Sequence, residues 1–247
     1  MRIAFDMDGV LADLHKPFVQ AALKLYPSLD ASAIGAADIG ASPPDDAAED
    51  QKSHAAPTPP AANVALSGRQ SDAVWKHLSN IENFWETLTE IDDGAIRRLA
   101  TLADERRWEV IFVTSRPTSA GLTVQRQSQR WLQRMGFPMP SVFVVHGSRG
   151  RIAEALRLDI VVDDRPDNCL DVVLESKAGA ILVWRGAEST MPASARRMGI
   201  GVVSTVDACL TALVEAERGS DGGLVDRLRR LLGLAVKSSK SSRIGQQ

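Results

Sequence analysis

The stretch RIAFDMDGVLAD, residues 2–13, contains a short apolar run that ends in Asp6 and is followed by Asp8 and Gly9. In open α/β sheets, side chains at the carboxyl ends of buried strands form the ligand site. Two carboxylates this close repel each other unless a cation or a transferable proton offsets their charge. The pattern therefore predicts a divalent metal at this strand end, with one carboxylate free to attack an electrophile. The alternative is an ordinary turn, since Asp and Gly are common turn residues.

Two further segments have the same form, an apolar strand that ends in polar residues. The run EVIFV ends in Thr114 and Ser115, and the run DIVV ends in the adjacent pair Asp163 and Asp164. Strands are predicted at residues 2–6, 109–114, 141–145, 159–163, 180–184 and, with a weaker pattern, 200–204. Helices are predicted at residues 93–107, 119–135, 149–157, 166–176 and 205–217. This alternation predicts an α/β protein with a parallel sheet and right-handed crossovers.

In this chain order, the three segments resemble motifs one, two and four of the haloacid dehalogenase-like (HAD) hydrolase superfamily, over roughly residues 2–185. The sequences DMDGVLAD, VTSRP and DDRPD are most similar in style to those of the 5′(3′)-deoxyribonucleotidases and their bacterial relatives. The resemblance implies a Rossmann-like, three-layer αβα core with an inserted helical cap of the C1 type.

The resemblance also implies catalytic roles for the residues that match the motifs. Asp6 would be the nucleophile that attacks phosphorus, and Asp8 would be the general acid and base. Thr114 and Ser115 would bind the phosphoryl oxygens. Arg116 follows them at the same edge of the sheet, where it is expected either to contact the substrate or to be an ordinary surface arginine.

Mg²⁺ is the cofactor that the resemblance implies. It would be held by the Asp6 carboxylate, the Asp8 backbone carbonyl and one of Asp163 and Asp164, with Asp164 preferred as the inner ligand. A set of oxygen ligands completed by waters and a phosphate oxygen suits Mg²⁺. The sequence alone does not separate the two aspartates of the late pair.

The third motif of the superfamily, a cation that is usually lysine, is matched least well. The segment between Thr114 and Asp163 contains no lysine, and the cations just before the late acidic strand are Arg149 and Arg151. Arg149 is preferred because it lies in Gly-Ser-Arg-Gly, where relatives often have Ser-Lys-Gly, but Arg151 stays possible. An arginine differs from lysine in its planar fork of donors, so the exchange is not neutral. If Arg149 is only a solvated residue at a helix start, we expect weak activity or phosphate binding without turnover.

About 80 residues separate the first strand from the helix predicted near Asp92, far more than an ordinary crossover needs. In the superfamily, an insertion at this point is a cap that covers the site, which favours a small substrate. We therefore assign residues 1–13 and 91–218 to the core and 14–90 to the cap, with a flexible Pro- and Ala-rich part at about 36–63. Residues 219–247 are expected to form an amphipathic helix, packed on the domain or on a partner, and a polar tail. Asp92 is the predicted N-cap of the helix that follows it.

Three aromatic residues of the predicted cap, Trp75, Phe84 and Trp85, have two interpretations. They form either a platform on which a nucleobase stacks or a small helical core. The core is preferred, because aromatic side chains at near-helical spacing usually pack inside.

The composition of the chain argues against several classes of partner and location. The net charge of −2 and the pI near 6.1 argue against a nucleic-acid or membrane partner. No apolar run approaches the roughly 20 residues that span a bilayer, no signal peptide is expected, and two distant cysteines fit a reducing cytoplasm. We therefore predict a cytoplasmic, Mg²⁺-dependent phosphohydrolase that cleaves a small phosphomonoester, preferably a (deoxy)nucleoside monophosphate. The alternatives are a 3′-phosphatase acting on nucleic-acid ends and a phosphate-binding protein with little turnover. The sequence leaves the oligomeric state open.

Overall fold

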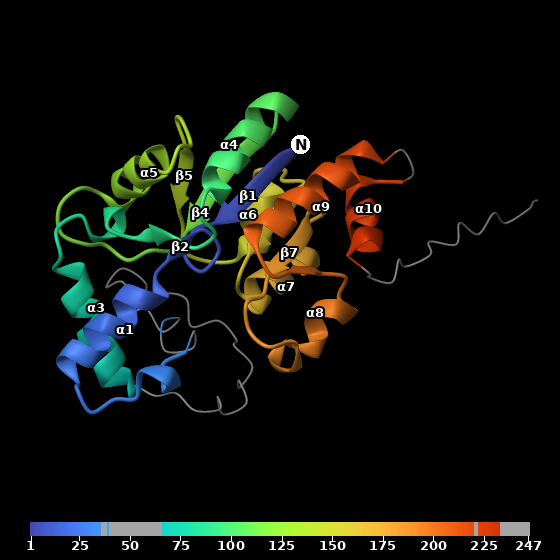
Figure 1. The fold of residues 1–247 in the computed structure, drawn as a ribbon. Helices are drawn as coiled ribbons and strands as arrows, with labels where there is room; N and C mark the ends of the chain where they lie inside the picture. The colour runs from blue at the N-terminus through green and yellow to red at the C-terminus, as the bar shows by residue number, and fades with distance from the viewer. Residues whose placement is uncertain (36–38, 40–65, 220–221, 233–247) are drawn as a thin grey trace, which may run out of the picture. The chain divides into compact units, whose positions relative to one another are not determined.

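The computed structural model describes residues 1–35, 39, 66–219 and 222–232. Its main sheet has six strands in the order β5-β4-β1-β6-β7-β8, with helices between successive strands along the chain (Figure 1). The strands are β1 (Arg2–Asp6), β4 (Glu109–Thr114), β5 (Ser141–Val144), β6 (Ile160–Asp163), β7 (Gly179–Val183) and β8 (Gly201–Val203). All six were predicted within about two residues at each end, and the parallel sheet confirms the predicted α/β, Rossmann-like fold class.

The chain divides into two compact units, one formed by Phe5–His146 and the other by Met1–Ala4 together with the chain from Gly147 onward. The first unit holds the end of β1, all of β4 and β5, and a small antiparallel pair of β2 and β3. Its other elements are β2 (Ala12–Asp13), α1 (His15–Leu25), η1 (Ala31–Ala33), α3 (Gly68–Ser79), η2 (Phe84–Glu86), β3 (Thr89–Glu90), α4 (Ala95–Arg106) and α5 (Val124–Arg134). Most of the predicted flexible part, residues 36–63, lies outside the described residues.

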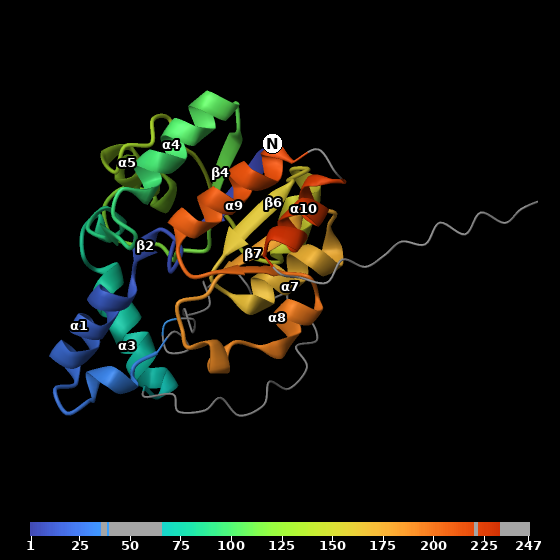
Figure 2. The ribbon, with the colours of Figure 1, turned by 45° about the vertical axis from the view of Figure 1, so that its right-hand side comes forward.

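The insertion after β1 contains helices α1 and α3, which lie side by side in Figures 1 and 2. Phe18 of α1 meets Trp75 of α3 with ring centroids 5.4 Å apart, and Trp85 lies 6.4 Å from Trp75 and 4.9 Å from Phe84. Trp75, Phe84 and Trp85 are all buried. The core interpretation of these aromatics is therefore confirmed.

The second unit continues the strand and helix alternation from α6 onward. Its elements besides β6, β7 and β8 are α6 (Arg149–Ala155), α7 (Pro166–Glu175), η3 (Glu188–Thr190), α8 (Ala193–Arg197), α9 (Val206–Arg218) and α10 (Leu224–Leu231). The parallel registers place Val162 opposite Ile181 and Leu182 opposite Val202. Gly150 lets α6 lie close to α7, because a Cβ at this position would overlap the carbonyl of Asp171.

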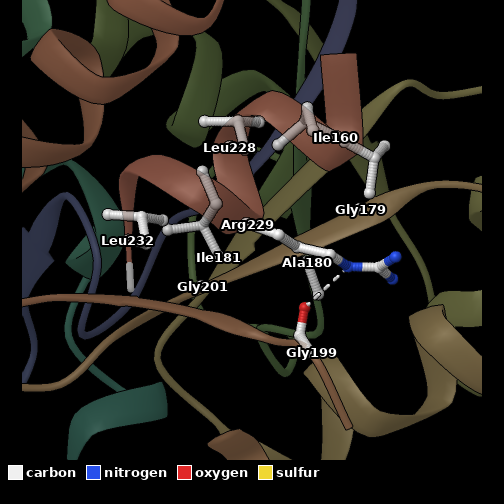
Figure 3. Close-up of a pocket in the computed structure, with 10 residues that line it drawn as sticks. Ile160, Gly179, Ala180, Ile181, Gly199, Gly201, Leu228, Arg229 and Leu232 are labelled. Atoms are coloured by element: carbon white, nitrogen blue, oxygen red, sulfur yellow. Dashed lines mark hydrogen bonds between the residues drawn. The ribbon is translucent and has the colours of Figure 1, made fainter. Parts of the chain in front are cut away.

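The C-terminal helix α10 packs on its own unit, beside β6 and β7 (Figure 2). Leu228 is buried, and Leu232 lies over Gly201, as the close-up in Figure 3 shows. Gly179 faces Val225 in the same way. Of the two arrangements expected for this amphipathic segment, packing on the domain is the one observed. Within the described ranges, no helix is long and apolar enough to cross a membrane.

Candidate active site

A tight turn after β1 fixes the backbone of the two motif-one aspartates. The amide of Ala12 donates to the carbonyl of Met7 at 2.7 Å, and the amide of Gly9 donates to the carbonyl of Ala12 at 3.0 Å. Gly9 has a φ of 82°, a value that glycine adopts without strain. Met7 is fully buried, as strand alternation predicts, and Asp6 is 8% exposed at the strand end. These backbone hydrogen bonds therefore fix the main chain that carries Asp6 and Asp8.

Arg116 forms a forked ion pair with Asp8. Its Nε lies 3.1 Å from Oδ1 and 2.8 Å from Oδ2 of Asp8, and its Nη2 lies 2.7 Å from Oδ1. The arginine side chain is fully buried, while the Asp8 side chain is 18% exposed. Arg116 was expected at the surface or in contact with substrate. It is not a surface arginine, because its guanidinium is buried and paired with Asp8.

Three further side chains enclose the Arg116 guanidinium. Nη1 donates to Oγ of Ser128 at 2.9 Å. The guanidinium carbon lies 4.7 Å from the ring centroid of Trp85 and 5.8 Å from that of Trp131, within cation–π range. Ser128 and Trp131 are three residues apart on α5 and so share one helix face. Trp85 comes from the insertion, so Arg116 is held by residues of both the insertion and the core.

The two hydroxyl residues of motif two lie in different surroundings. Thr114 is buried, and its Oγ1 donates to Oδ2 of Asp8 at 3.4 Å and accepts from the Arg116 amide at 3.4 Å. Ser115 is exposed. Both were expected to bind phosphoryl oxygens. In the structure, the hydroxyl of Thr114 is oriented by Asp8, whereas that of Ser115 is accessible.

In the second unit, Asp163 ends β6 and is completely buried. It accepts from the Arg165 amide at 2.8 Å and from Nδ2 of Asn168 at 3.1 and 3.0 Å, and Nε of Arg149 lies 3.6 Å from its Oδ2. Burial raises the pKa of Asp163, and the nearby charge of Arg149 together with these hydrogen bonds opposes that rise. Asp163 is thus tightly bound to its protein neighbours, while the adjacent Asp164 is partly exposed.

The two candidates for the motif-three cation also differ. Arg149 is 5% exposed and forms the ion pair with Asp163, whereas Arg151 is exposed. Ser148 caps α6, its Oγ accepting from the amides of Gly150 and Arg151 at 3.1 and 3.3 Å. The cap fixes the first turn of the helix from which Arg149 reaches Asp163.

The donor chemistry of the predicted metal ligands fits Mg²⁺. The set consists of hard oxygens, namely two carboxylates and a backbone carbonyl, and Mg²⁺ keeps several waters in its shell. Among the described residues, no group of three or more His, Cys, Asp or Glu side chains could hold a metal alone. A Mg²⁺ bound here would therefore complete its shell with water and substrate oxygens. The Asp8 carboxylate is bound by Arg116. This ion pair is compatible with the predicted metal ligand at Asp8, which is the backbone carbonyl and not the carboxylate.

Sequence reasoning did not identify three supporting residues. Ser128 and Trp131 hold Arg116, and Asn168 holds Asp163. Asn168 directly follows the DDRPD segment, and Ser128 and Trp131 have the spacing of one helix face, but neither pattern alone indicates a polar partner.

No known protein-family model matches the sequence. No curated protein matches it either. Solved structures do share the fold. A HAD-family hydrolase from Deinococcus radiodurans R1, with bound phosphate and sodium, matches with a TM-score of 0.51 and 16% identity, over 95% of this chain and 98% of that one. A Thermotoga maritima protein described as a β-phosphoglucomutase matches with a TM-score of 0.50 and 16% identity, over 87% and 98% of the two chains. At this level of identity, the similarity establishes the fold.

Proposed function

Because this chain has the fold of HAD-family hydrolases and carries their acidic and hydroxyl motifs at the strand ends, we propose that it is a Mg²⁺-dependent phosphohydrolase. Its substrate would be a small phosphomonoester. The observation that carries the proposal is the turn after β1, which presents Asp6 at the strand end and holds Asp8 two residues later in a fixed orientation. Phosphoryl transfer through an aspartate needs a nucleophilic carboxylate and a second group that transfers protons, and Asp6 and Asp8 supply these two kinds of group.

The reaction proceeds in two displacements. A carboxylate oxygen of Asp6 attacks phosphorus, a new P–O bond forms to Asp6, and the bond to the ester oxygen breaks. Asp8, whose carboxylate accepts from Arg116 and Thr114 in the structure, takes up a proton from solvent and gives it to the departing oxygen, so that an alcohol leaves. Asp8 then takes a proton from a water, whose oxygen attacks phosphorus and releases inorganic phosphate, and Asp6 is regenerated.

Other residues would bind the phosphoryl group and the metal. Ser115 would donate its accessible hydroxyl to a phosphoryl oxygen, and Thr114 would do so while it contacts Asp8. Mg²⁺ would be held by Asp6, the Asp8 carbonyl and Asp164, and when bound it would neutralise phosphoryl charge. Asp164 is favoured over Asp163 because it is partly exposed, whereas Asp163 is buried and already bonded to its neighbours.

Arg149 would serve as the motif-three cation. Its burial and its ion pair with Asp163 support this choice over the exposed Arg151.

We further propose that the substrate is a (deoxy)nucleoside monophosphate and that the protein works in the cytoplasm. The nucleotide rests on the style of the three motifs, because Trp75, Phe84 and Trp85 are buried and so offer no stacking platform. The cytoplasm is supported by the small number of cysteines, two that lie far apart in the sequence and are both buried.

The test is phosphate release from a panel of esters by the wild-type chain and by Asp6→Asn, with Mg²⁺ and with a chelator. The panel holds nucleoside and deoxynucleoside monophosphates, sugar phosphates, an aryl phosphate and a 3′-phosphorylated oligonucleotide. We expect metal-dependent release from a small ester that Asp6→Asn abolishes, while circular dichroism shows that the variant is folded. Release only from the oligonucleotide would point to a nucleic-acid 3′-phosphatase, and no release from any ester would refute the proposed function.

A further inference from the structure

We infer that Arg116 is a positioning residue for Asp8 and does not bind the substrate phosphate. The inference rests on the proposed function, because it concerns how the general acid of that reaction is held. It assigns to the buried fork between Arg116 and Asp8 a role in leaving-group protonation, and so in which esters the enzyme cleaves well.

The contacts of the Asp8 carboxylate fix its direction. Oδ1 is bound by Nε and Nη2 of Arg116, and Oδ2 by Nε of Arg116 and Oγ1 of Thr114. A carboxylate bound at both oxygens by a planar fork cannot rotate about its last torsion without breaking those bonds. The Asp8 side chain nevertheless keeps 18% of its surface exposed. It is therefore both fixed in direction and accessible to a substrate.

The contacts of the Arg116 guanidinium hold it inside the protein. All three nitrogens of Arg116 are engaged inside the protein, Nε and Nη2 by Asp8 and Nη1 by Ser128. Trp85 and Trp131 lie within cation–π range of the guanidinium, and its side chain has no exposed surface. To reach a phosphate, the guanidinium would have to leave these partners and leave the Asp8 carboxylate uncompensated, which is costly for a partly buried charge.

A buried ion pair is not the most stabilising choice at this position. An apolar side chain of similar volume between two tryptophans would commonly stabilise the fold as well as or better than a buried arginine. A charged residue at this position, beside the proposed general acid, is thus better explained by preorganisation of the site than by stability. Catalytic groups must be held within small tolerances of their productive direction, and groups outside the reaction usually do this.

The experiment compares two substrates that differ in their need for an acid. An alkyl phosphate has a poor leaving group and depends on protonation by Asp8, whereas an aryl phosphate with an acidic phenol leaves without it. Values of kcat/KM are measured for both with the wild type, Arg116→Met, Arg116→Lys and Ser128→Ala, together with inhibition by inorganic phosphate. Arg126→Met, an exposed arginine on the same helix as Ser128, is the matched control.

We expect Arg116→Met to lose about a hundredfold in kcat/KM for the alkyl ester, within the usual contribution of general acid catalysis, and far less for the aryl ester. Arg116→Lys and Ser128→Ala should show the same pattern with smaller losses, so Ser128→Ala keeps the test decisive if Arg116→Met does not fold. Inhibition by phosphate and all constants of Arg126→Met should stay unchanged.

Equal losses for both esters, or weakened inhibition by phosphate, would overturn the inference and return Arg116 to the role of a phosphate ligand. Absence of turnover in the wild type would instead refute the proposed function, and the inference with it. The two failures are therefore distinguishable.

Discussion

At the scale of single residues, each of the two compact units contains a buried arginine that pairs with one aspartate of the motifs. Arg116 pairs with Asp8 in one unit, and Arg149 pairs with Asp163 in the other. The sequence placed Arg149 near the site through its neighbours, Gly-Ser-Arg-Gly, but it did not predict the burial of Arg116. Burial depends on contacts from distant parts of the chain, here from Trp85 and Trp131.

Asn168 offers a direct test of how Asp163 is held. Replacing it with alanine removes the amide that donates to both Asp163 oxygens and leaves a buried carboxylate short of donors. We expect Asn168→Ala to lower the free energy of unfolding by about 1–3 kcal/mol in urea titrations. The control is Leu174→Ala on the same helix, where the side chain is 62% exposed, and we expect a change below about 0.5 kcal/mol. Equal effects of the two substitutions would contradict the role of Asn168.

At the scale of secondary-structure elements, the strands were predictable and the helix termini were less so. Each strand of the main sheet is a compact apolar run, which the sequence shows directly. The N-cap of α4 was predicted at Asp92, and this was wrong: the helix starts after Gly94, whose φ is 78°. The Glu90 carboxylate accepts from the amides of Gly94 and Ile96 at 3.0 and 2.6 Å. A cap supplied from four to six residues away follows no local capping pattern.

The docking of α10 is testable at Gly201. A Cβ at this position would lie 2.5 Å from Cδ1 of Leu232, so the C-terminal segment would have to move (Figure 3). We expect Gly201→Ala to lower the free energy of unfolding by about 1–3 kcal/mol, measured by urea denaturation.

Adding Leu232→Ala should recover part of this loss, because it removes the atom that the new methyl group meets. Losses that simply add in the double variant would show that the clash is not the cause, since independent sites add and contacting sites couple.

At the scale of the whole molecule, the fold class was predictable from the alternation of strands and helices, whereas the candidate site residues were predicted mostly from the resemblance to a family. The short elements α8, β2 and β3 were not predicted, because they carry too few residues for a periodic pattern. The packing of α10 was also open, since an amphipathic stripe shows that a face is covered and does not show by what. The supporting residues of the site depend on tertiary contacts and so became visible only in the structure.

Burial of the two cysteines gives a prediction for the pH dependence of stability. Both are buried, and burial raises the pKa of the Cys209 thiol to about 12. Between the ordinary thiol pKa of about 8.5 and this value, the unfolded chain loses the thiol proton and the folded chain keeps it. Stability should therefore fall as pH rises through this range, by up to about 1.4 kcal/mol per pH unit from this group.

Urea titrations across alkaline pH would measure that slope, and Cys209→Ala should reduce it after allowance for its own loss of packing. A thiol reagent should likewise label the chain only as fast as it unfolds. An unchanged slope in Cys209→Ala, or rapid labelling of the native protein, would show that this thiol is not held neutral by burial.

The central claim, catalysis through Asp6, is tested most directly by rapid acid quenching during turnover of a labelled phosphomonoester. The protein is then digested, and the peptide that carries the phosphoryl group is identified by mass spectrometry. We predict a hydroxylamine-sensitive phosphoryl group on the peptide that contains Asp6, present with Mg²⁺ and absent in Asp6→Asn. Phosphate release that continues in Asp6→Asn, or a phosphoryl group on another residue, would contradict the account.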